Sequence, residues 1–121
     1  MSIRLNRFDK IIAGLDGDAE LFAELAGPVA ARYEMTVYQL QNLAENQHYE
    51  EILKLVHKLK STWQLYVDDE EDFLAKFEQL AGVKDKKKMD EIISRIINCL
   101  STTSSELKIW VSSHNQNKLN K

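Results

Sequence analysis

The chain has 121 residues, of which 44% are hydrophobic and 29% are charged, and its formal net charge at pH 7 is −3. This length suits one domain, and the composition is typical of a folded globular chain. Four glycines and one proline are too few for the many turns of a sandwich or barrel. The acidic balance argues against a nucleic-acid partner, because proteins that bind nucleic acids usually carry a basic excess.

Cysteine usage and hydropathy indicate a compartment. A lone cysteine, Cys99, can form neither an internal disulfide nor a zinc cluster, which points to reducing surroundings. No stretch approaches the run of about 18 apolar residues that a membrane-spanning helix needs. The first nine residues are partly basic and lack the apolar core of a secretory signal. We therefore expect a whole, cytoplasmic chain with no membrane partner and no metal of its own.

A short first helix is predicted by four apolar residues that share one helical face. These residues are Leu5, Phe8, Ile11 and Ile12. The segment 14–17, with a glycine at each end, should terminate this helix. Asp16 or Asp18 is then expected to cap the next helix by accepting backbone N–H groups.

A long second helix is predicted by an apolar stripe that keeps helical phase over more than twenty residues. The stripe consists of Phe22, Leu25, Ala26, Val29, Tyr33, Thr36, Val37, Leu40, Leu43 and Ala44. Pro28 lies inside it. A proline removes one helical hydrogen bond and crowds the carbonyl four residues back, so we expect a kink near Pro28 rather than two separate helices.

The third helix should begin after Asn46, the expected N-cap, with Glu50 and Glu51 near its positive end. Its apolar stripe consists of Ile52, Leu55, Val56, Leu59, Trp63 and Tyr66. Asp68 and Asp69 should then open a fourth helix, which Gly82 would cap at its C-terminus. The apolar face of that helix consists of Phe73, Phe77, Leu80 and Ala81.

The last predicted helix carries Met89, Ile92, Ile93, Ile96, Ile97, Leu100, Leu107, Trp110 and Val111. The lysines of 86–88 are unfavourable at a helix N-terminus, so the pattern leaves its first turn open. Residues 112–121 lack apolar periodicity and are expected to be a polar, disordered tail. The sequence thus predicts a single domain over residues 1–111. Its fold class is all-α: an antiparallel four-helix bundle with a short extra N-terminal helix.

One histidine occupies the middle of a polar helix face. A helix turns about 100° per residue, which places His57 about 200° from the centre of the apolar stripe of the third helix. Its neighbours on that face are Lys54, Lys58, Lys60, Ser61 and Gln64. Histidine with its ordinary pKa of about 6.5 is mostly a neutral nucleophile at pH 7, and lysines would screen an incoming phosphoryl group. The arrangement suits a phosphoryl carrier, although most exposed histidines beside lysines have no chemical role.

The segment Val56-His57-Lys58-Leu59-Lys60-Ser61 resembles the signature of histidine-containing phosphotransfer (HPt) domains, a small or apolar residue followed by His-x-Leu-Lys-Gly. The resemblance extends from about residue 18 to 111 and includes the order and length of the helices. It implies that His57 is phosphorylated on Nε2 and that Lys60 contacts or screens the phosphoryl group. It also implies that Gln79, on the next helix, lies beside the histidine.

The sequence departs from this family in two places. Ser61 replaces the usual glycine, and Val67 replaces a glycine common ten residues after the histidine. Trp63 and Tyr66 are also bulkier than the usual small residues. Both point toward the core by helical phase, so we interpret them as repacking of the interior.

The resemblance implies a carrier that relays a phosphoryl group between receiver domains, one of a hybrid sensor kinase and one of a response regulator. The Mg²⁺ would belong to the receiver. Lys54, Lys58 and Lys60 would form a positive patch that complements the acidic pocket of a receiver. The chain has neither a GxxxxGK[ST] loop nor a GxGxxG loop, so no ATP-dependent kinase activity of its own is expected. We expect a monomer, because no exposed heptad seam requires a dimer.

Two other hypotheses remain open at this stage. In the first, the chain is an interaction module that binds a receiver or kinase and blocks transfer, and His57 is incidental. In the second, it is a helical structural domain unrelated to signalling. His48 and His114 have no partner at metal-ligand spacing and are expected to be inert. The lysine-rich segment 84–88 is expected to be a solvated turn.

Overall fold

The structure of the chain, a computed structural model, describes residues 8–119. These residues form five helices and contain no strand, which confirms the all-α prediction. The helices are α1 (Asp9–Gly14), α2 (Ala19–Glu45), α3 (Tyr49–Tyr66), α4 (Phe73–Val83) and α5 (Lys86–Leu119). Leu5, which the sequence places on the first helix, lies outside the described residues.

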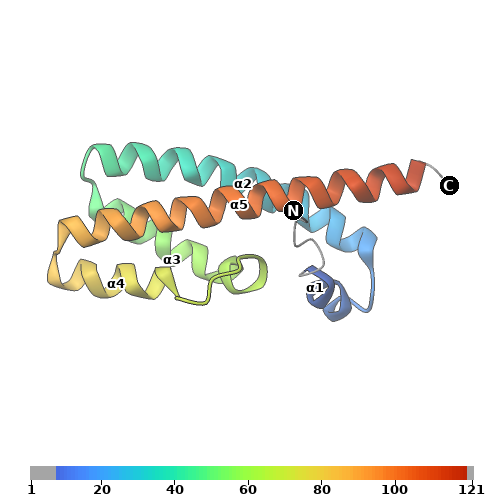
Figure 1. The fold of residues 1–121 in the computed structure, drawn as a ribbon, viewed down its shortest axis with the longest axis horizontal. Helices are drawn as coiled ribbons and strands as arrows, with labels where there is room; N and C mark the ends of the chain where they lie inside the picture. The colour runs from blue at the N-terminus through green and yellow to red at the C-terminus, as the bar shows by residue number, and fades with distance from the viewer. Residues whose placement is uncertain (1–7, 120–121) are drawn as a thin grey trace.

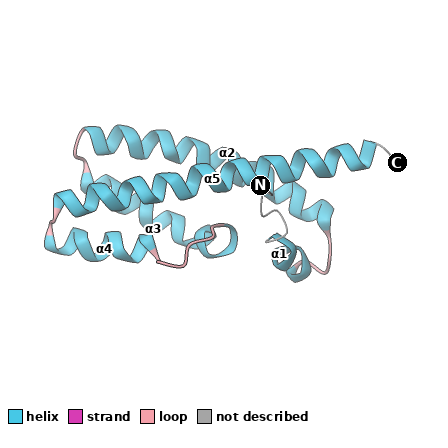
Figure 2. Ribbon diagram, viewed as in Figure 1, coloured by secondary structure: helices cyan, strands magenta, loops and turns pink. Residues whose placement is uncertain are grey.

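The two longest helices, α2 and α5, lie along one another, and α3 and α4 pack beside them (Figure 1). Short loops join successive helices (Figure 2). The C-terminal part of α5 extends beyond α3 and α4, toward the end of the molecule where α1 lies. The antiparallel course of α3 and α4 brings residues from both helices to one surface, where His57 lies.

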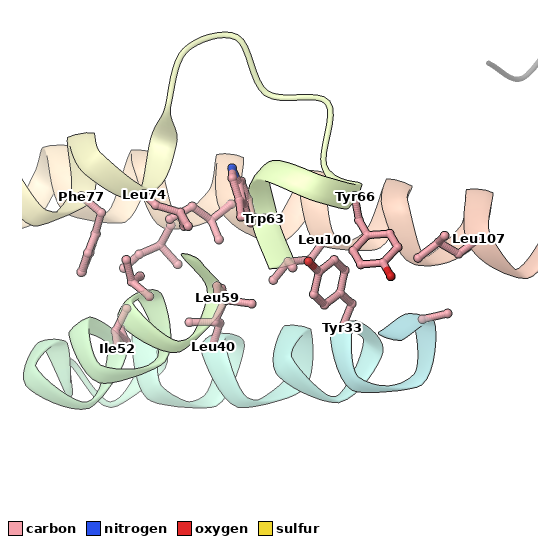
Figure 3. Close-up of a cluster of buried hydrophobic side chains, with 14 of the residues drawn as sticks. Tyr33, Leu40, Ile52, Leu59, Trp63, Tyr66, Leu74, Phe77, Leu100 and Leu107 are labelled. Atoms are coloured by element: carbon pink, nitrogen blue, oxygen red, sulfur yellow. The ribbon is translucent and has the colours of Figure 1, made fainter. Parts of the chain in front are cut away.

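The interior is built from the stripes that periodicity predicts, and all of the helices from α2 to α5 contribute to it (Figure 3). Trp63 and Tyr66 are buried, which confirms their predicted place in the core. Leu25 is the exception, because 43% of its side chain is exposed. Four buried residues are missing from the predicted stripes: Ala30, Leu74, Thr103 and Ser104.

Helix α2 continues without a break through Pro28, as predicted. The proline lies on an exposed position, where water can satisfy the carbonyl that loses its hydrogen bond. A kink at this position stays a prediction. Asp18 is the N-cap and accepts a hydrogen bond from the amide of Leu21 at 3.0 Å, so of the two predicted caps Asp18 is confirmed.

The predicted N-cap of α3 is wrong. Asn46 instead ends α2, where its Nδ2 donates to the carbonyl of Asn42 at 2.8 Å. The N-cap of α3 is His48, whose side chain makes no capping bond. The turn between the two helices needs Gln47 in the left-handed region, with φ of 57°, and this separates Asn46 from the start of α3.

The fourth helix also begins later than predicted. Asp69 lies outside α4, which begins at Phe73 with Asp72 as N-cap. The carboxylate of Asp69 instead binds the loop that precedes the helix. Its donors are the amides of Glu71 (2.9 Å), Asp72 (3.1 Å) and Phe73 (2.9 Å) and the indole Nε1 of Trp63 (3.0 Å). Asp69 thus accepts backbone amides as an N-cap residue does, but in a turn before the helix. For this reason its residue type predicted a helix start.

The C-terminal cap of α4 is Lys84 rather than the predicted Gly82. Gly82 lies within the helix, and the left-handed residue that follows it is Lys84, with φ of 56°. A lysine in this region is strained because its Cβ approaches the backbone, whereas glycine is not.

We therefore expect Lys84→Gly to stabilise the protein. Relief of the left-handed strain should raise the free energy of unfolding by about 0.5–1 kcal/mol. Urea denaturation of the two proteins measures the difference. Gly82→Ala is the matched control for the helix interior. It should also stabilise the protein, by about 1 kcal/mol, because alanine favours a helix over glycine by that amount. Apart from the helix's own backbone and the neighbouring residues, nothing lies within 4 Å of the added Cβ. A loss of stability in Lys84→Gly would contradict the assigned strain.

The C-terminal segment differs from its prediction. Residues 112–119 continue α5 instead of forming a disordered tail. The His114 ring stacks on Trp110, with centroids 5.1 Å apart, and its Nε2 lies 3.1 Å from a carboxylate oxygen of Glu20 on α2. Trp110 packs edge-on against Phe22 at 4.6 Å. These contacts hold the polar end of α5 against α2, and composition alone does not reveal them.

Candidate functional site

His57 lies on the exposed face of α3, as predicted, and 55% of its side chain is accessible. The neighbouring Val56 and Leu59 point into the core, so the backbone of this turn is fixed by packing. An exposed imidazole on a rigid helix can meet a partner without any rearrangement of the fold.

Glu78 of α4 joins His57 to Lys60. One of its carboxylate oxygens lies 3.2 Å from Nδ1 of His57, and the other pairs with the ammonium group of Lys60. Only 24% of the Glu78 side chain is exposed, so the carboxylate lies in the seam between the two helices. The three side chains form one connected group, which we call the His57 cluster.

The position of Glu78 selects one tautomer of His57. A negatively charged carboxylate 3.2 Å from Nδ1 attracts a proton on that nitrogen and repels a lone pair there, so in the neutral imidazole the proton belongs on Nδ1 and the lone pair on Nε2. This assignment follows from the charge beside Nδ1. The arrangement therefore leaves Nε2 as the nucleophilic atom.

Two of the predicted lysines lie along a groove between α2 and α3. This open groove has a volume of 590 Å³, with Leu43 and Leu55 among its lining and Lys54, Lys58 and His57 beside them. Lys54 also pairs with Glu51 at 3.3 Å. The structure thus brings a positive rim and an apolar surface next to the histidine, on the side away from Glu78.

Gln64 lies farther along α3 and lines a different groove. This second groove, of 720 Å³, runs between α1, α2 and the C-terminal end of α3, and it includes the exposed side chains of Leu25 and Leu65. Gln64 lies seven residues from His57, or about 10 Å along the helix axis. It belongs to the surroundings of the site and not to the His57 cluster.

The resemblance implies that Gln79 lies beside His57, and this stays a prediction. The side chain from α4 that reaches Nδ1 of His57 is Glu78, and Gln79 is exposed at the next position. Sequence reasoning missed Glu78. The one available signal was its place directly after Phe77, a core residue, which puts it at the edge of the packed face of α4.

Ser61 is exposed one turn after the histidine, and its hydroxyl donates to the carbonyl of Lys58 at 3.2 Å. A serine, a histidine and a carboxylate on one surface can form a hydrolytic triad if the hydroxyl binds the imidazole. Here the hydroxyl is bound to its own helix backbone. The geometry therefore favours His57 itself as the reacting group.

Cys99 does not offer a second reactive centre. Burial, followed by the negative charges of Asp69 and Asp68, raises the pKa of its thiol from 9.0 to about 11. We expect alkylation by iodoacetamide at pH 8 to be about a hundredfold slower than for an exposed thiol, since the thiolate is the reactive form. Mass spectrometry measures the rate, and the urea-unfolded chain is the control. Labelling of the folded protein as fast as the unfolded chain would contradict the assigned burial.

Within residues 8–119, no group of three histidine, cysteine or acidic side chains is arranged to hold a metal ion. None of the helices in that range combines the length and apolar character needed to cross a bilayer. Comparisons with known proteins add no relative: no family model, no curated protein and no solved structure matches the chain.

Proposed function

We propose that the protein is a histidine phosphotransfer protein, in which α2–α5 form the four-helix bundle and α1 is the short extra helix. His57 would accept a phosphoryl group from an aspartyl phosphate of one receiver domain and pass it to the aspartate of a second. The observation that carries this proposal is the His57 cluster. An exposed imidazole has a carboxylate 3.2 Å from its Nδ1, and this supports Nε2 as the nitrogen that would attack phosphorus.

The proposed transfer needs no second nucleophile and no proton transfer from this chain. The Nε2 lone pair attacks phosphorus, the bond from phosphorus to the aspartyl oxygen breaks, and the carboxylate leaves with the electron pair. The proton stays on Nδ1, and the neighbouring carboxylate of Glu78 offsets the positive charge that develops on the ring. Mg²⁺ would be supplied by the receiver.

Lys60 would exchange its ion pair with Glu78 for one with the phosphoryl group during this step. Its ammonium group pairs with Glu78, and a phosphoryl group on the adjacent histidine would present a higher negative charge within reach. Lys60→Ala should therefore slow transfer more than it changes stability. Lys54 and Lys58, on the other side of His57, would steer the acidic pocket of a receiver toward the groove.

The test is transfer from a panel of phosphorylated receiver domains to the wild-type protein. We expect label that is labile in acid and stable in base, which identifies phosphohistidine. The fastest donor would define the partner. Lack of label from every receiver, together with measurable binding of one, would reject the proposal and favour the blocking module.

That second candidate has its own support. The ammonium group of Lys60 is bound to Glu78 and is not free in the isolated chain. Ser61, in place of a glycine, adds a side chain on the exposed face one turn from the histidine, and Val67 is a second departure from the family at the C-terminal end of α3. A module that binds a receiver through the groove without accepting phosphate would need neither Nε2 nor a mobile Lys60. The variants His57→Gln and Lys60→Ala would therefore leave its binding to the receiver unchanged.

Glu78 should control the rate of transfer. Glu78→Gln keeps a side chain of the same size but removes the charge that offsets the phosphorylated ring, and we expect transfer to slow about tenfold. Rapid-quench measurement of phosphohistidine formation gives the rate. Gln79→Ala is the matched control, because Gln79 is the exposed neighbour of Glu78 on α4 and its replacement removes no charge from the His57 cluster. Equal rates in wild type and Glu78→Gln, or an equal loss in Gln79→Ala, would count against this role.

A further inference from the structure

The junction of α4 and α5 carries a concentrated positive charge. Residues 83–88, which we call the basic turn, comprise the last residue of α4, the two residues between the helices and the first turn of α5, so the predicted solvated turn over 84–88 is helical from residue 86. They contain four lysines, and among them only Asp85 is acidic. Val83 is 74% exposed, more than any other large apolar side chain within the described residues. The basic turn lies at the end of the molecule opposite the C-terminus of α5 (Figure 1). It lies beside the start of α3, where Glu51 lines both the groove next to Lys86 and the groove next to His57.

Little of this charge is offset within the described part of the chain. Asp85 caps α5 by accepting a hydrogen bond from the amide of Lys88 at 3.2 Å, and its other oxygen lies 4.0 Å from the ammonium group of the same lysine. Between residues 8 and 119, no ion pair involves Lys84, Lys86 or Lys87. Lys86 lines a groove together with Glu50 and Glu51 at the start of α3. Lys84 and Lys87 are exposed and face solvent, on a protein whose net charge is −3.

Two local costs meet in this turn. Lys84 adopts a left-handed conformation that glycine would adopt without strain. The lysines in the first turn of α5 lie at the positive end of the helix dipole, where a positive charge is unfavourable. Such departures from local preference are expected at functional surfaces. In both departures a lysine stands where another residue would be more stable, and in both cases the lysine adds positive charge to the basic turn.

We propose that the basic turn binds an acidic segment of a partner protein, with an apolar side chain of that segment seated on Val83. The proposal does not depend on the proposed function of His57. Charge complementarity identifies the partner chemistry. An anionic membrane is disfavoured because Val83 is the one exposed large apolar side chain on the turn and the rest of the protein is acidic. Nucleic acid is disfavoured because the turn presents no aromatic side chain for base stacking.

The experiment titrates the full chain with a synthetic peptide rich in Asp and Glu that carries one Leu, followed by amide NMR. Its counterpart with Asn and Gln is the neutral probe. We expect shifts confined to residues 83–88 and neighbouring positions of the helix ends, and binding that weakens with added salt. The neutral peptide should cause no shift.

Variants separate binding from stability. Lys84→Gly should bind the acidic peptide at least about threefold more weakly although it is the more stable protein, and Lys84→Gly with Lys87→Gln should weaken binding at least about tenfold. The double variant Lys54→Gln and Lys58→Gln changes the net charge by the same amount at the His57 groove, and it should bind as the wild type does.

Several results would overturn the proposal. One is a loss of affinity for the acidic peptide in the double variant Lys54→Gln and Lys58→Gln that equals the loss in the double variant of the basic turn. The others are amide shifts centred on the groove beside His57 rather than on the basic turn, and no binding of the acidic peptide at all. Tighter binding of phosphatidylserine vesicles or of single-stranded RNA than of the acidic peptide would also overturn it, in favour of a membrane or a nucleic acid.

Discussion

Replacing His57 by glutamine is expected to abolish phosphoryl acceptance and to leave the fold intact. Glutamine has no nucleophilic nitrogen, so no covalent intermediate can form on this position. The side chain is 55% exposed and its one polar contact is with Glu78. Surface changes of this kind alter the free energy of unfolding by no more than about 0.5 kcal/mol. Loss of activity with unchanged stability would thus assign the chemistry to this imidazole.

The measurement follows phosphate from a labelled receiver to wild type and His57→Gln side by side, with urea denaturation of both proteins. His48→Gln is the matched control, because His48 is also exposed at the surface of the same helix and its side chain makes no capping bond. Label that persists in His57→Gln would place the acceptor elsewhere. An equal loss in His48→Gln would mean that the effect is not specific to the site.

The course of the helices could be predicted from the sequence because their apolar stripes are long. The stripe of α3 determines which residues face the core, and by the same geometry it directs His57 to solvent. The ends of the helices are a different matter. Asp69 and Asn46 have the residue types of N-caps, but each instead binds backbone groups of a neighbouring turn. Their role depends on how the chain turns there, which periodicity does not define.

The part of the candidate site that lies on α3 was predictable from the sequence, and the part that α4 contributes was not. His57 and Lys60 lie three residues apart on one helix, and helical geometry alone places them together. Glu78 comes from another helix, and its contact with both depends on the register between α3 and α4. That register is set by the loop 67–72, whose course could not be derived from composition. The sequence therefore pointed to Gln79 on this helix and did not single out its neighbour Glu78.

The same loop carries the last prediction. Asp69→Ala should lower the free energy of unfolding by about 2–3 kcal/mol. The carboxylate accepts hydrogen bonds from three amides and from the Trp63 indole, and hydrogen bonds to a charged group are worth about 1.5–3 kcal/mol each, without being additive. Urea denaturation measures the loss. In a Trp110→Phe background, fluorescence of Trp63 should shift to the red as its indole loses its partner and meets water.

Glu70→Ala is the control, since it removes the same charge from an exposed position of the same loop. It should leave both stability and fluorescence close to those of the wild type. Asp69→Ala should also slow phosphoryl transfer, because the start of α4 is no longer held against α3 and Glu78 loses its register with His57. Transfer at the wild-type rate in a clearly destabilised Asp69→Ala would show that Glu78 reaches the imidazole without the loop. Equal stability of the two variants would show that Asp69 does not anchor the loop.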